Sequence, residues 1–245
     1  MSHELLSGDI SSETSATLAA ATDVAVKHMV RRRFLQSGAA VAGVALASSL
    51  GSNESQAAPT GPRQQLALVR RHENDHVAFL VSALNTVGQQ MGMNVTRPKP
   101  TFQNLVQPNL NAFLTTSLAL ENTGVGAYLG AAPAIFNRTY LAAAGQIALV
   151  EARHAGFFNG LRSLPMTNNV FGQELSFERA LTVSEVTAAA GPFIQSLNDP
   201  MNQFPLTFSS TPSASNDLAI LNFALALEYL EADFYVANVM KFYGV

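Results

Sequence analysis

Apolar residues recur at steps of three and four positions along four long segments of the 245-residue chain, with few helix breakers inside them. This spacing gathers the apolar side chains on one face of an α-helix. It predicts helices over about Pro62–Met91, Asn109–Ala131, Pro133–Leu164 and Ser215–Phe242. No segment shows a convincing strand pattern. The sequence therefore predicts an all-α fold, a four-helix bundle.

Residues that favour turns and caps separate these helices. Thr96–Pro100 contains two prolines and divides the first helix from the second. Pro133 suits the first turn of the third helix, because its fixed φ angle matches a helix start. Ser215 or Asn216 is the expected N-cap of the last helix.

About fifty residues lie between the third and fourth helices. Thr182 followed by Glu185 has the pattern of a capping box, which predicts an extra short helix running to about Leu197. The stretch Asn198–Ser215 holds three prolines and is predicted to be a long loop before the last helix. Within it, Phe204–Phe208 could be extended.

The N-terminal region has the three parts of an export signal in order. A basic cluster, Arg31–Arg33, precedes a short apolar run, Ser37–Leu50, and small residues follow up to Ala57. The Arg-Arg-x-Phe-Leu core resembles a twin-arginine signal, a resemblance that implies a cofactor inserted before export. We therefore expect a lead-in and signal over residues 1–57, a bundle domain over 58–245, a periplasmic or secreted location and no permanent membrane anchor after cleavage. The alternative is a disordered basic tail before a short core helix.

Composition excludes two classes of function. The chain carries a formal charge of −3 and has no basic block beyond the N-terminal cluster, so nothing favours nucleic-acid binding. It contains no cysteine, which rules out disulfides, thiolate metal sites and cysteine nucleophiles.

Two short motifs occur twice along the predicted helices. The second and fourth helices share Leu-Ala-Leu-Glu with a tyrosine seven residues after the glutamate, and the first and third share Glu-x-x-His. The matching residues are Glu121 with Tyr128, Glu228 with Tyr235, Glu73 with His76, and Glu151 with His154. This repetition indicates a duplicated two-helix unit.

The repeated residues predict a metal site. Residues three apart lie on one helix face, so a Glu-x-x-His pair can bind one metal or two adjacent metals. One Glu from each of two helices, with Glu-x-x-His from the other two, is the ligand set of dinuclear iron and manganese carboxylate proteins. We therefore predict a dinuclear iron or manganese centre in two halves: Glu73 and His76 with Glu121, and Glu151 and His154 with Glu228.

A single Glu-x-x-His pair is usually a solvated surface pair. Here, however, only three histidines follow residue 57, and two of them, His76 and His154, stand three residues after a glutamate. The third, His72, is expected at the surface or beside the ligands. Tyr128, Tyr235 and Glu231 are expected next to the ligands. Core packing is equally open for the tyrosines, and Glu231 could replace or supplement Glu228.

Three segments resemble the ferritin-like family that includes desiccation-related proteins: Asn222–Tyr235, Leu120–Ala132 and Val150–Ala155. The stretch from Leu181 to Ile194 is also similar. The resemblance implies a ferritin-like bundle, often exported, with a metal site and a poorly defined activity. The family usually places the Asn-Phe-Ala-Leu-x-Leu-Glu helix first, whereas here it comes last. The chain thus resembles a circular permutation, whose last helix closes its own bundle or swaps into a partner.

These expectations favour an exported ferritin-like protein whose metal centre acts on O₂ or peroxide in stress protection. The chemistry would be ferroxidase-like or catalase-like, and no residue is assigned a catalytic role. The alternative is a non-catalytic desiccation- or stress-protective bundle with a structural metal or none. Metal ions are the expected partners, and the sequence leaves a homo-oligomer open.

Overall fold

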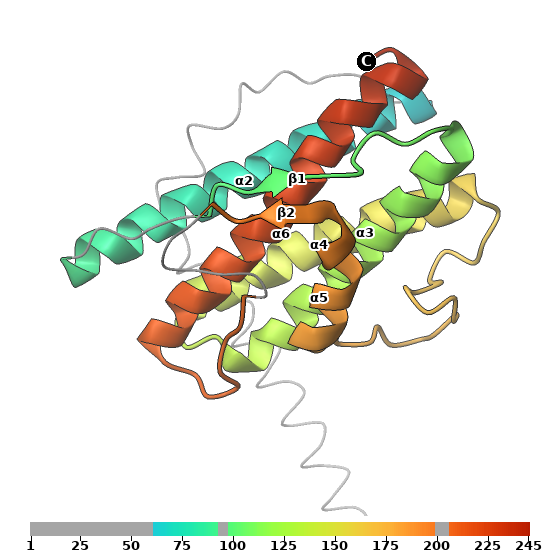
Figure 1. Cartoon of the computed structure of the whole chain (residues 1–245). Coiled ribbons are helices and arrows are strands. Elements are labelled where there is room, and N and C mark those ends of the chain that lie inside the picture. The colour runs from blue at the N-terminus through green and yellow to red at the C-terminus, as the bar shows by residue number, and fades with distance from the viewer. Residues whose placement is uncertain (1–60, 93–97, 199–205) are drawn as a thin grey trace, which may run out of the picture. The chain divides into compact units, whose positions relative to one another are not determined.

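The computed structural model describes residues 61–92, 98–198 and 206–245 of the chain (Figure 1). Four long helices dominate the described residues: α2 (Pro62–Met91), α3 (Leu110–Ala131), α4 (Arg138–Leu161) and α6 (Ala214–Tyr243). This confirms the predicted all-α class and the number of long helices. The predicted signal lies outside the described residues, so the division at residue 57 stays a prediction.

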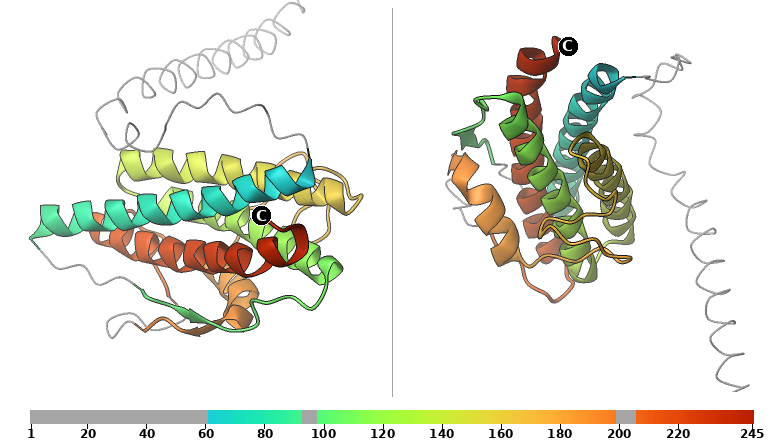
Figure 2. Two further views of the ribbon diagram at one scale, coloured as in Figure 1. Left: turned by 90° about the horizontal axis from the view of Figure 1, so that it is seen from above. Right: turned by 90° about the vertical axis from the view of Figure 1, so that its right-hand side faces the viewer.

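The four helices form two packed pairs. α2 lies against α6, α3 lies against α4, and further contacts between α3 and α6 join the pairs (Figure 2). Arg63 donates a hydrogen bond to the Gly244 carbonyl (2.7 Å) and Arg70 donates one to the Val245 carbonyl (2.9 Å). The start of α2 therefore lies beside the end of α6, and the two helices are antiparallel. The last helix closes the bundle of its own chain.

The start of α4 differs from the prediction. Pro133 lies in a short 3₁₀ turn, η2 (Ala132–Ala134), and α4 begins only at Arg138. Asp217, at the start of α6, accepts hydrogen bonds from the backbone N–H groups of Phe136 (2.7 Å) and Asn137 (2.8 Å). These bonds hold the chain out of the helix for several residues. Asn137 then caps α4.

The start of α6 also corrects a prediction. Ser213 is the N-cap, and its hydroxyl accepts a hydrogen bond from the Asn216 backbone N–H (3.1 Å). Asn216 is not the cap, because its side-chain amide donates to the carbonyls of Ala134 and Ser209. Asn216 thereby ties the loop before α6 to η2, the turn that follows α3.

The predicted short helix begins where expected but ends early. Thr182 and Glu185 form the capping box of α5 (Val183–Ala190). The chain then turns through η3 (Gly191–Phe193), because Pro192 cannot continue the helix hydrogen bonding. α5 packs against α3.

A short antiparallel strand pair, β1 (Thr101–Phe102) and β2 (Ile194–Ser196), follows instead of the predicted helix end. The pair was not predicted, since two or three residues are too few to show an alternating pattern. The predicted extended stretch Phe204–Phe208 begins outside the described residues. Among the residues described, no helix combines the length and apolar character needed to cross a membrane.

Candidate metal centre

All four long helices contribute a buried acidic side chain to the middle of the bundle. α2 carries Glu73 and His76, α3 carries Glu121, α4 carries Glu151 and His154, and α6 carries Glu228. Each of the six is at most 9% exposed. The structure thus brings together every residue that the sequence predicted as a metal ligand. Their role as ligands stays a prediction.

The six residues form two overlapping groups. In each group the potential ligand atoms lie within 4.8 Å of one another. The groups are Glu73, His76, Glu151 and Glu228, and Glu73, Glu121, Glu151 and His154. Because Glu73 and Glu151 belong to both groups, they occupy the positions from which a carboxylate could bridge two ions.

The division into halves predicted from the sequence is wrong. The prediction joined His76 with Glu121 and His154 with Glu228. In the structure His76 lies with Glu228 and His154 lies with Glu121. The reason is that α2 packs against α6 and α3 against α4, so the halves follow the packed pairs instead of the order along the chain.

Carboxylate oxygens from three different helices surround a single nitrogen of His76. His76 Nδ1 lies 3.1 Å from Glu73 Oε2, 3.1 Å from Glu151 Oε1 and 3.2 Å from Glu228 Oε2. One ring nitrogen carries at most one proton, so it cannot donate to three carboxylates. Among the described residues, Glu73 Oε1 and both Glu151 oxygens make no well-aligned hydrogen bond, although Glu151 Oε1 lies 3.1 Å from His76 Nδ1 and Glu73 Oε1 lies 3.0 Å from His154 Nδ1. Since two histidines cannot neutralise four buried carboxylates, this arrangement favours cations between the oxygens.

The second histidine faces the other group in the same way. His154 Nδ1 lies 3.0 Å from Glu73 Oε1 and 3.0 Å from Glu121 Oε2. Both histidines therefore present Nδ1 to the carboxylates. Oxygen ligands combined with imidazole suit iron and manganese, and two divalent cations would balance four carboxylates.

Burial and the histidines shift the carboxyl pKa values in opposite directions. Burial by itself would raise the pKa of Glu73, but close contacts with His154 and His76 outweigh it and lower that pKa from 4.5 to about 2. Burial raises the pKa of Glu151 well above 4.5, aided by the charge of Glu73, and it also raises the pKa of Glu228. The chain by itself therefore holds protons that a divalent cation would displace.

The histidines hold protons because the neighbouring carboxylates raise their pKa values. Burial would lower the pKa of His154, but Glu121 and Glu73 raise it from 6.5 to about 11. Contacts with Glu151 and Glu228 likewise outweigh burial and raise the pKa of His76. Each ring is thus positively charged at neutral pH unless a metal replaces its proton.

Two tyrosines contact the carboxylates reciprocally. Tyr128 on α3 donates a hydrogen bond to Glu228 on α6, and Tyr235 on α6 donates one to Glu121 on α3. Burial raises the pKa of both tyrosines well above 10, so both hydroxyls stay protonated. They lie where the sequence predicted supporting residues.

Glu231 lies one turn after Glu228 on α6 and is also buried. It belongs to neither group of potential ligands. Burial, reinforced by the charges of Glu121 and Glu73, raises its pKa well above 4.5. The geometry therefore favours a protonated neighbour of the site over a replacement for Glu228.

Two further residues shape the site. His72 Nδ1 lies 2.9 Å from His154 Nε2, and the rings are nearly parallel (7°), so His72 contacts the nitrogen that faces away from the carboxylates. A Cβ atom on Gly124 would lie 2.9 Å from Glu151 Oε2, so only glycine leaves room for that carboxylate. The signal for Gly124 was a glycine inside a helix, three residues after Glu121, where glycine is unfavourable.

Comparison with known families agrees with this geometry. Residues 32–163, just over half of the 245, match the ferritin-like domain family. The match contains α2 and α3 and runs past the end of α4, whereas α6 lies beyond it. Comparisons with curated proteins and with solved structures gave no match. The chain therefore belongs to the ferritin-like domain family.

Proposed function

We propose that this ferritin-like protein binds a dinuclear iron or manganese centre and acts on O₂ or peroxide in stress protection. Glu73 and Glu151, which belong to both ligand groups, would help to hold both ions, and each remaining ligand would help to hold one. When bound, such a centre supplies redox chemistry toward O₂ or peroxide. The proposed ligands are Glu73, His76, Glu121, Glu151, His154 and Glu228.

One observation carries this proposal. The two ligand groups overlap at Glu73 and Glu151, both of which are fully buried. Three of their four carboxylate oxygens make no well-aligned hydrogen bond within the described residues, and the nearest histidine nitrogens to Glu151 Oε1 and Glu73 Oε1 lie at 3.1 Å and 3.0 Å. A cation that replaces the histidine protons would therefore find carboxylate oxygens of both residues available to it.

The surrounding residues would orient the ligands. Tyr128 and Tyr235 fix one oxygen of Glu228 and Glu121, which leaves the other oxygen of each carboxylate to a metal. His72 contacts Nε2 of His154, the nitrogen that faces away from the carboxylates, and would orient the ring as outer hydrogen-bond partners of metal-bound histidines do. The hydroxyls and the outer histidine would thereby set the direction of each ligand before a metal arrives.

We further propose that the protein is exported through the twin-arginine route to the periplasm or beyond. The Arg31–Leu35 motif and the apolar run after it support this. We also propose that the chain is a circular permutation of the desiccation-related arrangement. The family match stops at residue 163, although α6 supplies Glu228 to the same site.

The alternative is a non-catalytic protective bundle with a structural metal or none. It is favoured by the ion pairs that the protonated histidines make with the carboxylates, since these neutralise part of the buried charge without metal. This function would require the bundle to remain folded when no metal is bound.

Metal analysis of the folded protein tests the proposal. We expect about two iron or manganese ions per chain. Glu151→Gln should remove both ions because Glu151 belongs to both groups, whereas Glu121→Gln should remove mainly one. Glu178→Gln, which changes an exposed carboxylate, is the matched control and should keep both ions.

A folded protein that takes up no iron or manganese, or whose metal content is unchanged by Glu151→Gln, would contradict the metal proposal. Oxygen uptake and peroxide consumption by the metal-loaded protein then separate an enzyme from a structural metal protein. Activity that disappears with Glu151→Gln and persists with Glu178→Gln would support catalysis.

A further inference from the structure

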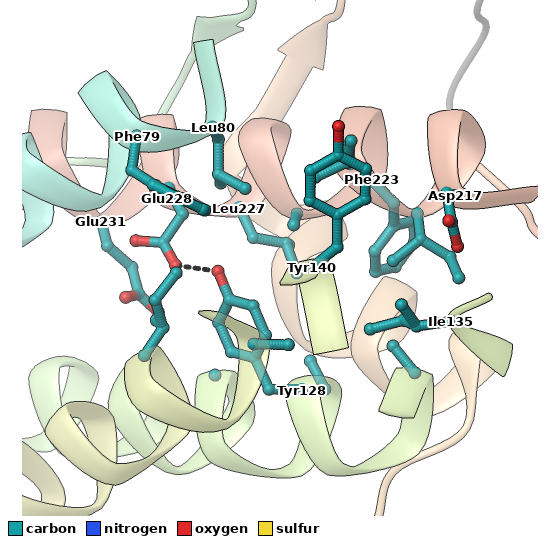
Figure 3. A pocket seen from close by; sticks show the side chains of 18 residues that line it. Phe79, Leu80, Tyr128, Ile135, Tyr140, Asp217, Phe223, Leu227, Glu228 and Glu231 are labelled. Carbon is teal, nitrogen blue, oxygen red and sulfur yellow. Dashed lines mark hydrogen bonds between the residues drawn. The ribbon is translucent and has the colours of Figure 1, made fainter. Parts of the chain in front are cut away.

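We infer that a small apolar cavity admits dioxygen to one side of the candidate metal centre, the side of Glu228. The cavity lies between α2, α3, α4 and α6, with Glu228 and Glu231 at one end and Asp217 at the other (Figure 3). The binding of dioxygen depends only on the cavity itself. The role of the cavity as a route for a substrate rests on the proposed function.

The two equivalent tyrosines of the duplicated motif have different surroundings. Tyr235 is fully buried. Three phenylalanine rings pack around it, with ring centroids 6.3, 6.1 and 5.4 Å from its own: Phe113, Phe158 and Phe234. Tyr128, in contrast, is half-buried and lines the cavity. The bundle is therefore filled by aromatic rings on one side of the centre and hollow on the other.

Small residues on two helices produce the hollow side. The wall on α3 is formed by Gly124, Ala127 and Ala131, which follow one another at steps of three and four positions and so share one face of the helix. Ala144 adds a small residue on α4. Larger side chains at these positions would reach into the cavity, so the space is a property of the sequence.

The size of the cavity limits what it can hold. Its volume is about 40 Å³. At about 10–15 Å³ for each water molecule, it has room for roughly three water-sized molecules. The cavity therefore fits a diatomic molecule and is too small for a substrate built on a carbon ring or a long chain.

The lining favours an apolar occupant. Most of the described residues that line the cavity are aliphatic or aromatic, and the acidic ones lie at its ends. The carboxylate of Asp217 already accepts two backbone N–H groups, and Glu228 accepts the hydroxyl of Tyr128. Water and hydrogen peroxide would lose hydrogen bonds along the apolar wall, whereas dioxygen has none to lose. The lining thus favours dioxygen over peroxide.

The inner end of the cavity meets one half of the proposed metal centre. Tyr128 lines the cavity and donates its hydrogen bond to Glu228, which shares a ligand group with His76. Phe79 and Leu227 are half-buried and place one side of the cavity near the surface. A molecule that enters there would first reach the ion position beside His76 and Glu228.

Alanine-methyl NMR of the metal-free, full-length protein under oxygen and under nitrogen tests this inference, because dissolved dioxygen is paramagnetic and speeds the relaxation of nearby nuclei. The reporters are the methyl groups of Ala131 and Ala144, which line the cavity. The matched controls are Ala155 and Ala190, which do not line it, and all four residues are at most 7% exposed. We expect oxygen to relax the reporter methyls several-fold faster than the controls. Equal relaxation of all four overturns the inference.

Filling variants locate the oxygen. Ala131→Leu should reduce the effect at the Ala144 methyl to the control level, and Ala144→Leu should do the same at Ala131. Ala119→Leu and Ala152→Leu add the same side chain at exposed positions of the same helices and should leave the effect unchanged. Circular dichroism establishes that each variant is folded, and the unaltered protein decides the matter if both filling variants unfold. An undiminished effect in a folded filling variant overturns the inference.

The two tyrosines test whether access is one-sided. In protein with labelled tyrosine, oxygen should speed the ring relaxation of Tyr128 several-fold more than that of Tyr235, since only Tyr128 of the two lines the cavity. Equal effects on the two rings would contradict one-sided access.

Measuring oxygen and metals on the same preparations separates this inference from the proposed function. Oxygen in the cavity of a protein that never takes up iron or manganese would contradict only the metal centre. Two bound ions without oxygen in the cavity would contradict only the inference about dioxygen.

Discussion

The hydroxyl group of Tyr235 on α6 donates a hydrogen bond to Glu121 on α3, across the interior of the bundle. Tyr128 on α3 returns the same contact to Glu228 on α6. Each tyrosine stands seven residues after the glutamate of its own helix and supports the glutamate of the other. The two lone glutamates are therefore held by the helix opposite them.

Removing the hydroxyl group of Tyr235 should destabilise the fold. Tyr235→Phe leaves a buried Glu121 oxygen without its donor, which we expect to lower the free energy of unfolding by about 1–3 kcal/mol. Urea unfolding of the chelator-treated protein measures this loss in the free energy of unfolding. Tyr229→Phe is the control, because Tyr229 is half-buried on the same helix and packs against the apolar cluster that contains Leu80 and Leu221. Equal urea midpoints for the two variants would contradict the prediction.

Gly124→Ala should disturb the metal centre while leaving the helix intact. The new Cβ atom would lie 2.9 Å from Glu151 Oε2, so the carboxylate must move. We expect metal affinity to fall roughly 10–100-fold, the range for changes that misplace a ligand. Competition with a metal-binding dye measures this loss.

Gly145→Ala is the matched control for that variant. Gly145 lies in α4, where an added Cβ atom meets nothing within 4 Å. It should keep normal metal affinity and gain about 0.5–1 kcal/mol of stability, since alanine favours the helix. Normal metal binding by Gly124→Ala would show that Glu151 does not depend on this space.

His72→Phe should weaken the ion on the His154 side. His72 is the partner of His154 Nε2, and losing it frees the ring to turn. We expect that ion to bind roughly 10–100-fold more weakly, so the metal content falls from about two per chain toward one. Asp75→Asn, an exposed change on the same helix, should retain both ions. Identical metal contents for the two variants would rule out this role.

The stability of the metal-free protein should fall as the pH rises. The pKa of His154 is raised from 6.5 to about 11, so its contribution is fully present below pH 6.5 and is lost as the pH rises through 11. The raised pKa values of Glu151 and Glu228 act in the same direction above pH 4.5, because the folded state holds their protons more tightly. Urea unfolding at several pH values between 6.5 and 11 measures this trend.

Glu73 contributes to stability with the opposite pH dependence. Bound metal should also reduce the loss of stability at alkaline pH. The pKa of Glu73 is lowered to about 2, so its contribution is present above pH 4.5 and is lost as the pH falls toward 2. Bound metal displaces the protons of the other groups, which should flatten the decline above pH 6.5. Metal-free protein that gains stability between pH 6.5 and 11 would be inconsistent with these shifts.

The fold was predictable wherever local patterns decide it. The apolar spacing gave both bounds of α2, Pro62–Met91, and the capping box gave the start of α5. The start of α4 was not predictable, since it depends on Asp217, which lies 81 residues from Phe136. A bond between such distant positions leaves no trace in a local pattern.

The candidate site was likewise predictable where local patterns decide it and not where distant contacts do. Residue type and spacing identified the six side chains that meet in the bundle, because Glu-x-x-His and Leu-Ala-Leu-Glu recur. The partnership of His76 with Glu228 could not be predicted, since spacing within one helix does not say which helices pack together. The position of His72 cannot be predicted for a similar reason, since its partner His154 belongs to α4, on another part of the chain.

The pairing of helices also orders the folding of the site. α3 and α4 are neighbours along the chain and can form a hairpin early, since closing a short loop costs little entropy. α2 and α6 stand at opposite ends of the bundle sequence, so their pairing is the slow, non-local step. The hairpin already presents Glu121, Glu151 and His154, but Glu73, which both groups share, arrives only with α2. Refolding in the presence of metal should therefore capture both ions in the slow step in which α2 and α6 join the α3–α4 hairpin.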